Sequence, residues 1–242
     1  MNEVFTISGL YIIISFLCAI EASTSLARIA GLNTGNLASG LQLQSGLSLF
    51  SRALMAIFMP MLGSLADSNY FNEGNIQIVY FSTALIPILL CTTYAWKSEL
   101  LSIYLSSAIN LVKKGSYFPI RFSQIKYNWR TNKEEKKLGR LSAFRWISFL
   151  AYIPFYLAWP IIIMLLSYYP DRRGFIIGLS SIMNGITTLA LILYIDPVLI
   201  RFSRYKKLSI IIYNDQLKIR ILSAILSSLP FVAGGIYLFF AK

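Results

Sequence analysis

An arginine interrupts a long apolar stretch, at a place where a charged side chain is costly. Arg52 is the one charged residue in positions 39–66. An arginine at the centre of a membrane helix costs at least about 2.5–3.5 kcal/mol unless it is paired or faces water. With about 100° of rotation per residue, Gln42, Ser45 and Ser48 share a third of the helix surface with Arg52. This polar seam predicts either a hydrated cavity in which Arg52 binds an anion, or an arginine that pairs with a carboxylate and locks two helices together.

A second group of polar side chains lies at the end of the first apolar stretch. Glu21, Ser25 and Arg28 are spaced i, i+4 and i+7, so they share one face of a helix. Gly31 follows, where a glycine permits a tight turn and leaves backbone donors accessible. Glu21 is the obvious internal counter-ion for Arg28 or Arg52, and the two arginines together predict a path for an anionic group.

Three further polar positions have a simple interpretation and a more specific one. Asp67 and Asp196 stand at the ends of the second and fifth apolar stretches, where a solvated helix end or a cap is the simple interpretation and a catalytic acid the alternative. Asn184, with Thr187 and Thr188, predicts either close helix packing or the lining of a cavity.

The residue types that are missing exclude several classes of chemistry. The chain has no histidine and only two cysteines, Cys18 and Cys91, both in apolar runs. Histidine zinc sites, Ser-His-Asp triads and a disulfide framework are therefore excluded. There is no phosphate-binding loop motif and no pair of clustered aspartates, so we expect neither ATP hydrolysis nor a Mg²⁺ site, and no cofactor.

The composition is that of a membrane protein. Of the 242 residues, 56% are hydrophobic and 13% are charged, whereas soluble domains carry about 25% charged residues. The net charge of +12 comes from 22 basic and 10 acidic residues, and we interpret it as basic membrane loops rather than as nucleic-acid binding. The sequence predicts an all-α integral membrane protein, with residues 1–242 in one polytopic domain.

The charges divide the chain into six stretches close to the roughly 20 residues that cross a bilayer. They are residues 4–20, 39–66, 74–96, 146–170, 174–195 and 221–241. The sequence therefore predicts six transmembrane helices, in two three-helix halves of opposite topology. Pro87 and Pro230 interrupt the third and sixth spans, which either indicates inverted repeats or is ordinary for membrane helices.

One further apolar segment, residues 100–112, is too short to cross a bilayer. Ser102, Ser106 and Asn110 fall on one face of it, and apolar side chains cover the rest. We predict an amphipathic helix over residues 98–113 that lies in the cytoplasmic interface, with its apolar positions toward lipid and the three polar residues toward water or headgroups.

The basic residues indicate the orientation in the membrane. The loops after the third and fifth predicted spans, together with Arg28, carry eighteen basic residues on one side, against three on the other. Because basic loops stay in the cytoplasm, we expect both termini outside. Residues 97–145 then form a basic cytoplasmic loop, which contains the amphipathic helix and whose aromatic residues favour contact with anionic lipid.

The first part of the chain resembles a known family. The stretch from Glu21 to Gly35, followed by Ser51-Arg52, by the segment from Pro60 to Gly63 and by Asp67, resembles the Amj family of bacterial lipid II flippases, which are alternates to the larger MurJ type. Farther on, the resemblance rests on the span pattern and the basic central loop. The matching positions are Glu21, Arg28, Gly31, Ser51, Arg52, Pro60 and Asp67.

The resemblance implies a flippase without ATPase motifs. Its substrate would be an undecaprenyl-pyrophosphate-linked sugar, lipid II or a related lipid-linked glycan, moved from the inner to the outer leaflet of the bacterial inner membrane during cell-envelope synthesis. The expected partners are this glycan and membrane lipids, and a homo-oligomer is compatible with the sequence. Together with the polar seam, the resemblance makes these residues candidates for substrate binding: Arg28, Arg52, Glu21, Gln42, Ser45, Ser48, Ser51, Gly31 and Asp67.

Two other function classes fit the same residues. A membrane enzyme that acts on polyprenyl phosphates would also use intramembrane arginines, although the sequence shows no nucleophile or metal site for it. A non-transporting partner in envelope assembly is the other alternative, and such a protein would tolerate the loss of Arg52.

The charge asymmetry leads to a test of topology in a variant without Cys18 and Cys91. Single cysteines at Asn2 and Asn75 should react with an impermeant thiol reagent added to intact cells, because both lie on the side with few basic residues. A cysteine at Arg130 or Asn214 should react only after the membrane is permeabilised. External labelling at Arg130 would contradict the six-span topology.

Overall fold

The protein is a bundle of long helices. The computed structural model describes residues 3–68, 76–114, 142–202 and 206–240, and the described residues are helical with no strand. The elements are α1 (Glu3–Asn33), α2 (Leu37–Asp67), α3 (Ile76–Trp96), α4 (Ser98–Lys114), α5 (Ser142–Tyr168), the 3₁₀ turn η3 (Pro170–Arg172), α6 (Arg173–Ala190), the π turn η4 (Leu191–Ile195), α7 (Asp196–Phe202) and α8 (Lys206–Phe240). Six helical segments in the described ranges are long and apolar enough to cross a membrane. The chain is an all-α, multi-pass membrane protein, as the sequence predicted.

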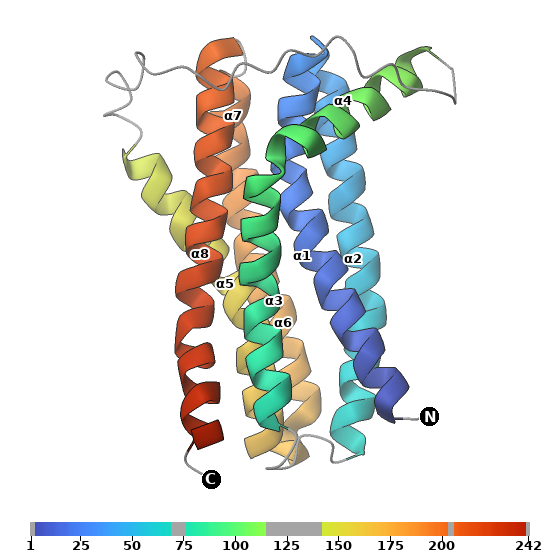
Figure 1. The fold of residues 1–242 in the computed structure, drawn as a ribbon, viewed down its shortest axis with the longest axis vertical. Coiled ribbons are helices and arrows are strands. Elements are labelled where there is room, and N and C mark those ends of the chain that lie inside the picture. Colours follow the sequence, from blue (N-terminus) through green and yellow to red (C-terminus); the bar gives the residue numbers. More distant parts are fainter. Residues whose placement is uncertain (1–2, 69–75, 115–141, 203–205, 241–242) are drawn as a thin grey trace.

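The two ends of the bundle differ (Figure 1). The start of α1 and the end of α8 lie together at one end, called here the terminal end, and α4 crosses the opposite end, called here the α4 end. An even number of crossings places both chain ends on one side, in agreement with the six-span prediction. Which side of the membrane this is stays a prediction.

Two helices run well beyond the predicted spans. α1 continues past Glu21 to Asn33, and α8 begins at Lys206 rather than near position 221. The prediction treated charges as span ends, and it was wrong here because Arg28 and Arg220 are buried inside helices, with 3% and 6% of their surfaces exposed. Neither arginine belongs to a basic loop. The excess of basic residues on that side of the membrane remains large when both are left out.

One labelling position changes for the same reason. Asn214 lies inside α8, and its side-chain oxygen is buried, so a cysteine there would report burial rather than sidedness. Arg201 is exposed near the end of α7 and on the same predicted side, which makes it the better site.

α1 and α2 form a tight hairpin. In the turn, Gly35 has a φ of 69°, and the Asn36 side chain caps α2 by accepting a hydrogen bond from the Ser39 backbone at 3.2 Å. Beside the turn, a Cβ added to Gly31 would lie 2.7 Å from the Cα of Gly40. The two helix backbones touch here because neither residue has a side chain.

The helices pair in a way that suits two inverted halves. α1 packs on α2 as α5 packs on α6, α3 lies along α8, and α1 contacts α8 as α3 contacts α5. This pairing is the one that a pseudo-two-fold relation between the halves requires. The repeat itself stays a prediction.

The fifth span is one continuous helical run that contains a π turn. In η4 the backbone N–H of Asp196 bonds to the carbonyl of Leu191, five residues earlier. Pro197 follows and has no N–H to donate. Such irregular turns are frequent at functional positions, and this one directly precedes Asp196, whose carboxylate faces α1.

Three apolar clusters fill the bundle, and two of them lie toward its opposite ends. The cluster near the terminal end includes Leu10 and Ile14 of α1, Phe58 of α2, Trp159 of α5 and Ile176 of α6. The cluster near the α4 end includes Leu26 and Ile29 of α1, Ile195 of η4, Leu199 of α7 and Ile211 of α8. Between these two lie polar side chains and the third apolar cluster, which surrounds Tyr152 of α5.

α4 exists as predicted, but its serines face the bundle and not water. Ser102 and Ser106 are 2% and 0% exposed, whereas Leu100 and Tyr104 are 49% and 48% exposed. The prediction that the serines face water was wrong, because small side chains let α4 pack closely on the bundle, where it contacts α1. Ser102 also satisfies its hydroxyl locally, by donating to the carbonyl of Glu99 at 2.8 Å, whereas the Ser106 hydroxyl has no partner among the described residues.

The Gly31–Gly40 contact predicts an unequal response to alanine. Gly31→Ala should lower the free energy of unfolding by about 1–3 kcal/mol, because its Cβ would push α1 and α2 apart. Gly46→Ala is the matched control in α2, where a Cβ meets nothing within 4 Å, and it should be neutral or slightly stabilising. Unfolding in detergent micelles measures both, and equal stability of the two variants would show that the close contact is unimportant.

Candidate functional site

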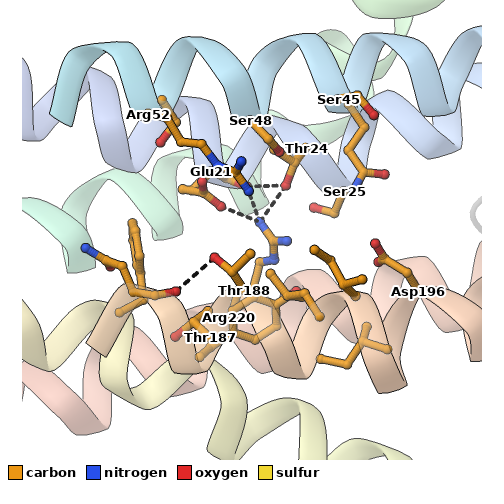
Figure 2. A pocket seen from close by; sticks show the side chains of 18 of the residues that line it. Glu21, Thr24, Ser25, Ser45, Ser48, Arg52, Thr187, Thr188, Asp196 and Arg220 are labelled. Carbon is orange, nitrogen blue, oxygen red and sulfur yellow. Dashed lines mark hydrogen bonds and ion pairs between the residues drawn. The ribbon is translucent and has the colours of Figure 1, made fainter. Parts of the chain in front are cut away.

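A polar chamber of about 770 Å³ lies between the apolar clusters of the two ends. Figure 2 shows Ser45, Ser48 and Arg52 of α2 on one wall, and Thr187 and Thr188 of α6 on the facing wall. α1, α5, α7 and α8 complete the lining. The polar and charged side chains that line it are Glu21, Thr24, Ser25, Arg28, Gln44, Ser45, Ser48, Ser51, Arg52, Tyr152, Ser181, Asn184, Thr187, Thr188, Asp196, Tyr213, Gln216 and Arg220.

Most of the residues that the sequence selected meet in this chamber. Six of the nine candidates line it: Glu21, Arg28, Ser45, Ser48, Ser51 and Arg52. The sequence predicted either helix packing or cavity lining for Asn184, Thr187 and Thr188. The lining role is confirmed.

Three candidates do not line the chamber. Gln42 is exposed, and Gln44 lines the chamber in its place. The face of α2 that lines the chamber is centred near Ser48, and Gln42 lies about 120° away from Ser48 around the helix. Gly31 packs against Gly40. Asp67 is at the terminal end of α2, so none of the three is placed to bind a ligand in the chamber.

Glu21 pairs with an arginine that the sequence analysis assigned to a loop. The Nη1 atom of Arg220 lies 3.9 Å from Oε2 of Glu21, donates to the backbone carbonyl of Glu21, and donates to the Thr24 hydroxyl at 2.8 Å. The guanidinium also lies 4.5 Å from the centre of the Tyr152 ring. The prediction that Glu21 is the counter-ion of Arg28 or Arg52 was therefore wrong.

Arg28 has a different acidic partner. Its Nη2 atom lies 2.5 Å from Oδ1 of Asp196, its Nε donates to the side-chain oxygen of Gln44, and its guanidinium lies 5.9 Å from the centre of the Tyr213 ring. The Asp196 side chain is 26% exposed. Asp196 is thus a partly buried link between α1 and α7, and the simple interpretation of a solvated helix end was wrong for it.

Of the three arginines that line the chamber, Arg52 is the one without a partner in the described parts of the chain. Within the described parts of the chain it forms no ion pair and no hydrogen bond, although it lines the chamber. The structural alternative, an arginine paired with a carboxylate to lock helices, therefore lacks its carboxylate here.

The chamber has an excess of positive charge and unused hydrogen-bond donors. Its described lining holds three arginines and two carboxylates, which leaves one net positive charge. The Nη1 atom of Arg28 and the side-chain amide of Asn184 are buried without a partner among the described residues. Buried donors without partners are rare in proteins and mark places where a ligand or water binds. An anion with several oxygen acceptors suits this arrangement.

The chamber opens sideways between α2 and α6. Near the terminal end the two helices touch, where the Ser180 hydroxyl lies 3.5 Å from the Met59 sulfur and Asp67 pairs with Arg173. Toward the α4 end both helices have exposed residues in the chamber lining. The lining residues there are exposed at the mouth of the chamber: Ser45, Leu49 and Arg52 of α2, and Ser181, Leu189 and Ile192 of α6 and η4.

Sequence reasoning missed the wall that α8 contributes. Tyr213, Gln216 and Arg220 are spaced i, i+3 and i+7, the same face pattern that identified Glu21 and Arg28. This signal was present, but it lay in a segment assigned to a basic loop. No three His, Cys, Asp or Glu side chains among the described residues cluster closely enough to hold a metal ion.

The Arg28–Asp196 pair predicts a double-mutant result. Arg28→Leu alone should lower the free energy of unfolding by about 3 kcal/mol, because it leaves a largely buried carboxylate unpaired. Arg28→Leu with Asp196→Leu should recover most of this loss. As a control, Arg145→Leu breaks the more exposed pair with Asp215 and should change stability by about 1 kcal/mol or less. Unfolding in detergent micelles gives all three values, and an additive double mutant would show that the pair is not coupled.

Comparison of the chain with protein-family models, with curated proteins and with solved structures found no match. The chamber and its charges therefore have to be interpreted from their own geometry.

Proposed function

We propose that this protein is a flippase for a lipid with an anionic phosphate headgroup, and that the headgroup passes through the arginine-lined chamber. The observation that carries the proposal is the unpaired Arg52 in a polar chamber with one net positive charge. A chamber built only to stabilise the bundle would pair each of its charges, since an unpaired arginine in a membrane is costly.

The size and chemistry of the chamber suit a diphosphate joined to a sugar. About 770 Å³ is within the usual range of roughly 300–1,000 Å³ for small-molecule sites. Arg52 and the free donors of Arg28 and Asn184 can bind phosphate oxygens, and the serines and threonines of α2 and α6 can bind sugar hydroxyls. Four of the seven matching residues of the family resemblance line this chamber: Glu21, Arg28, Ser51 and Arg52.

The sideways opening suits a substrate that keeps its tail in lipid. Leu49 and Phe50 on α2, and Ile186 and Leu189 on α6, are large exposed apolar residues beside the gap between the two helices. A polyprenyl chain can lie against them while the headgroup enters the chamber, so the apolar tail never crosses a polar space. We propose an undecaprenyl-pyrophosphate-linked sugar, lipid II or a related glycan, moving toward the outer leaflet of the bacterial inner membrane.

Arg52 gives the direct test of this function. Arg52→Ala should insert and fold, because Arg52 makes no hydrogen bond or ion pair in the described parts of the chain. It should lower transport about tenfold or more through the loss of a charged phosphate contact. Arg52→Lys should be partly active, because an ammonium keeps the charge but loses the forked geometry of guanidinium. Proteoliposomes that contain a fluorescent undecaprenyl-diphosphate sugar, with headgroup accessibility followed over time, measure this.

Arg172→Ala is the matched control, since Arg172 is exposed at the terminal end and outside the chamber. It should transport at the wild-type rate. Full activity of Arg52→Ala at an equal protein level would contradict the proposal, and released phosphate or a new lipid product would favour the membrane-enzyme alternative.

A further inference from the structure

The charges around the chamber do not match those of the proposed headgroup. The described lining has one net positive charge. A diphosphate esterified at both ends, to a polyprenol and to a sugar, carries two negative charges at neutral pH. A filled chamber would then hold one uncompensated negative charge inside a low-dielectric slab, which is strongly unfavourable.

We propose that headgroup binding is coupled to the uptake of one proton, and that Glu21 receives it. The inference rests on the proposed function, because it takes a diphosphate diester as the ligand. A proton from the aqueous phase bonds to a carboxylate oxygen of Glu21, the carboxylate becomes a neutral acid, and no other covalent bond changes in the protein or the ligand. Carboxyl groups inside membrane proteins commonly carry protons in this way.

Glu21 is better placed for this role than Asp196. Its carboxylate is 3.9 Å from Arg220, at the limit of an ion pair, whereas Asp196 lies 2.5 Å from Arg28. The Glu21 side chain is 20% exposed and faces the chamber (Figure 2). In the described parts of the chain no hydrogen bond holds the Glu21 carboxylate in its charged form.

Protonation of Glu21 would remove the negative charge that balances Arg220, while the Arg220 guanidinium stays in place. The guanidinium keeps its bonds to the Glu21 backbone carbonyl and to Thr24 at 2.8 Å, and it keeps its contact with the Tyr152 ring. The arginine therefore stays in position while its charge becomes available to a phosphate. The proton thus supplies the second positive charge that a diphosphate needs.

The groups around Glu21 leave few other candidates for the proton. Arginine, tyrosine and cysteine side chains already carry their protons, so the two carboxylates are the groups of the lining that can accept one. α6 contributes no ionisable side chain to the lining. The ionisable groups that face Glu21 or share its chamber are Cys18 and Arg28 of α1, Arg52 of α2, Tyr152 of α5, Asp196 of α7, and Tyr213 and Arg220 of α8, with Cys91 of α3 behind Cys18.

Calorimetry with two soluble probes tests the proposal on the purified full-length protein. The first probe is a short isoprenyl diphosphate esterified to N-acetylglucosamine, and the second is the matched monophosphate diester, which has one negative charge. Neither probe titrates near neutral pH, so binding heats measured in two buffers of different ionisation enthalpy give the protons that the protein takes up. We expect close to one proton with the diphosphate and none with the monophosphate.

Three variants assign the proton. Glu21→Gln should bind the diphosphate without proton uptake, and its affinity should not depend on pH. The wild-type affinity should fall by up to about tenfold per pH unit as the pH rises. Glu99→Gln, an exposed glutamate outside the chamber, should behave as wild type. Proton uptake that persists in Glu21→Gln and disappears in Asp196→Asn would overturn the assignment to Glu21.

The two proposals fail in different ways. Wild-type protein that binds the diphosphate without proton uptake, including binding balanced by sodium, overturns the coupling and leaves the flippase proposal standing. This result needs no variant, so it decides the question even if Glu21→Gln does not fold. Wild-type protein that binds neither probe contradicts the diphosphate-lipid substrate, and the coupling falls with it.

Discussion

The bundle depends on one electrostatic constraint, which is that an arginine inside a membrane needs a carboxylate, polar atoms or water beside it. α1 meets this constraint twice, through Arg28 with Asp196 and through Glu21 with Arg220. These contacts join positions 168 and 199 residues apart in the chain. They therefore determine how α7 and α8 stand against α1, and they explain why α1 is central although it begins the chain.

Packing then decides where the polar level opens. Lipid provides little hydrophobic force between helices, so close contact requires small side chains. The Gly31–Gly40 contact and the serine face of α4 bring helices together near the α4 end. α2 and α6 touch where the Ser180 hydroxyl meets the Met59 sulfur. Farther toward the α4 end the two helices contribute Arg52 and Asn184, whose long or polar side chains line the chamber.

The sequence predicted the helices better than the partners of the charges. Runs of uncharged residues are a local signal, so six spans and α4 could be found from them. Arg52 could be recognised as unusual because its cost depends only on its surroundings in the chain. The pairing of Glu21 with Arg220 could not be found in this way, because it depends on how distant helices pack. The face of α4 was predicted wrongly for a related reason, since a serine suits water and a tight helix contact equally well.

For a flippase, the chamber must also open toward the terminal end at another stage, and the contacts that close this end suggest which ones must break. The Asp67–Arg173 pair is more than half exposed on both sides, so it contributes little to closure. The edge-to-face contact of Phe58 with Trp159, 4.7 Å between ring centres, lies in the apolar cluster below the chamber and excludes water. Opening would have to separate these rings, whereas closing the mouth near the α4 end would bring α6 toward α2. The π turn η4 stands between α6 and α7, directly before Asp196, which pairs with Arg28. It therefore lies between the part of the segment that would open and the part that would close.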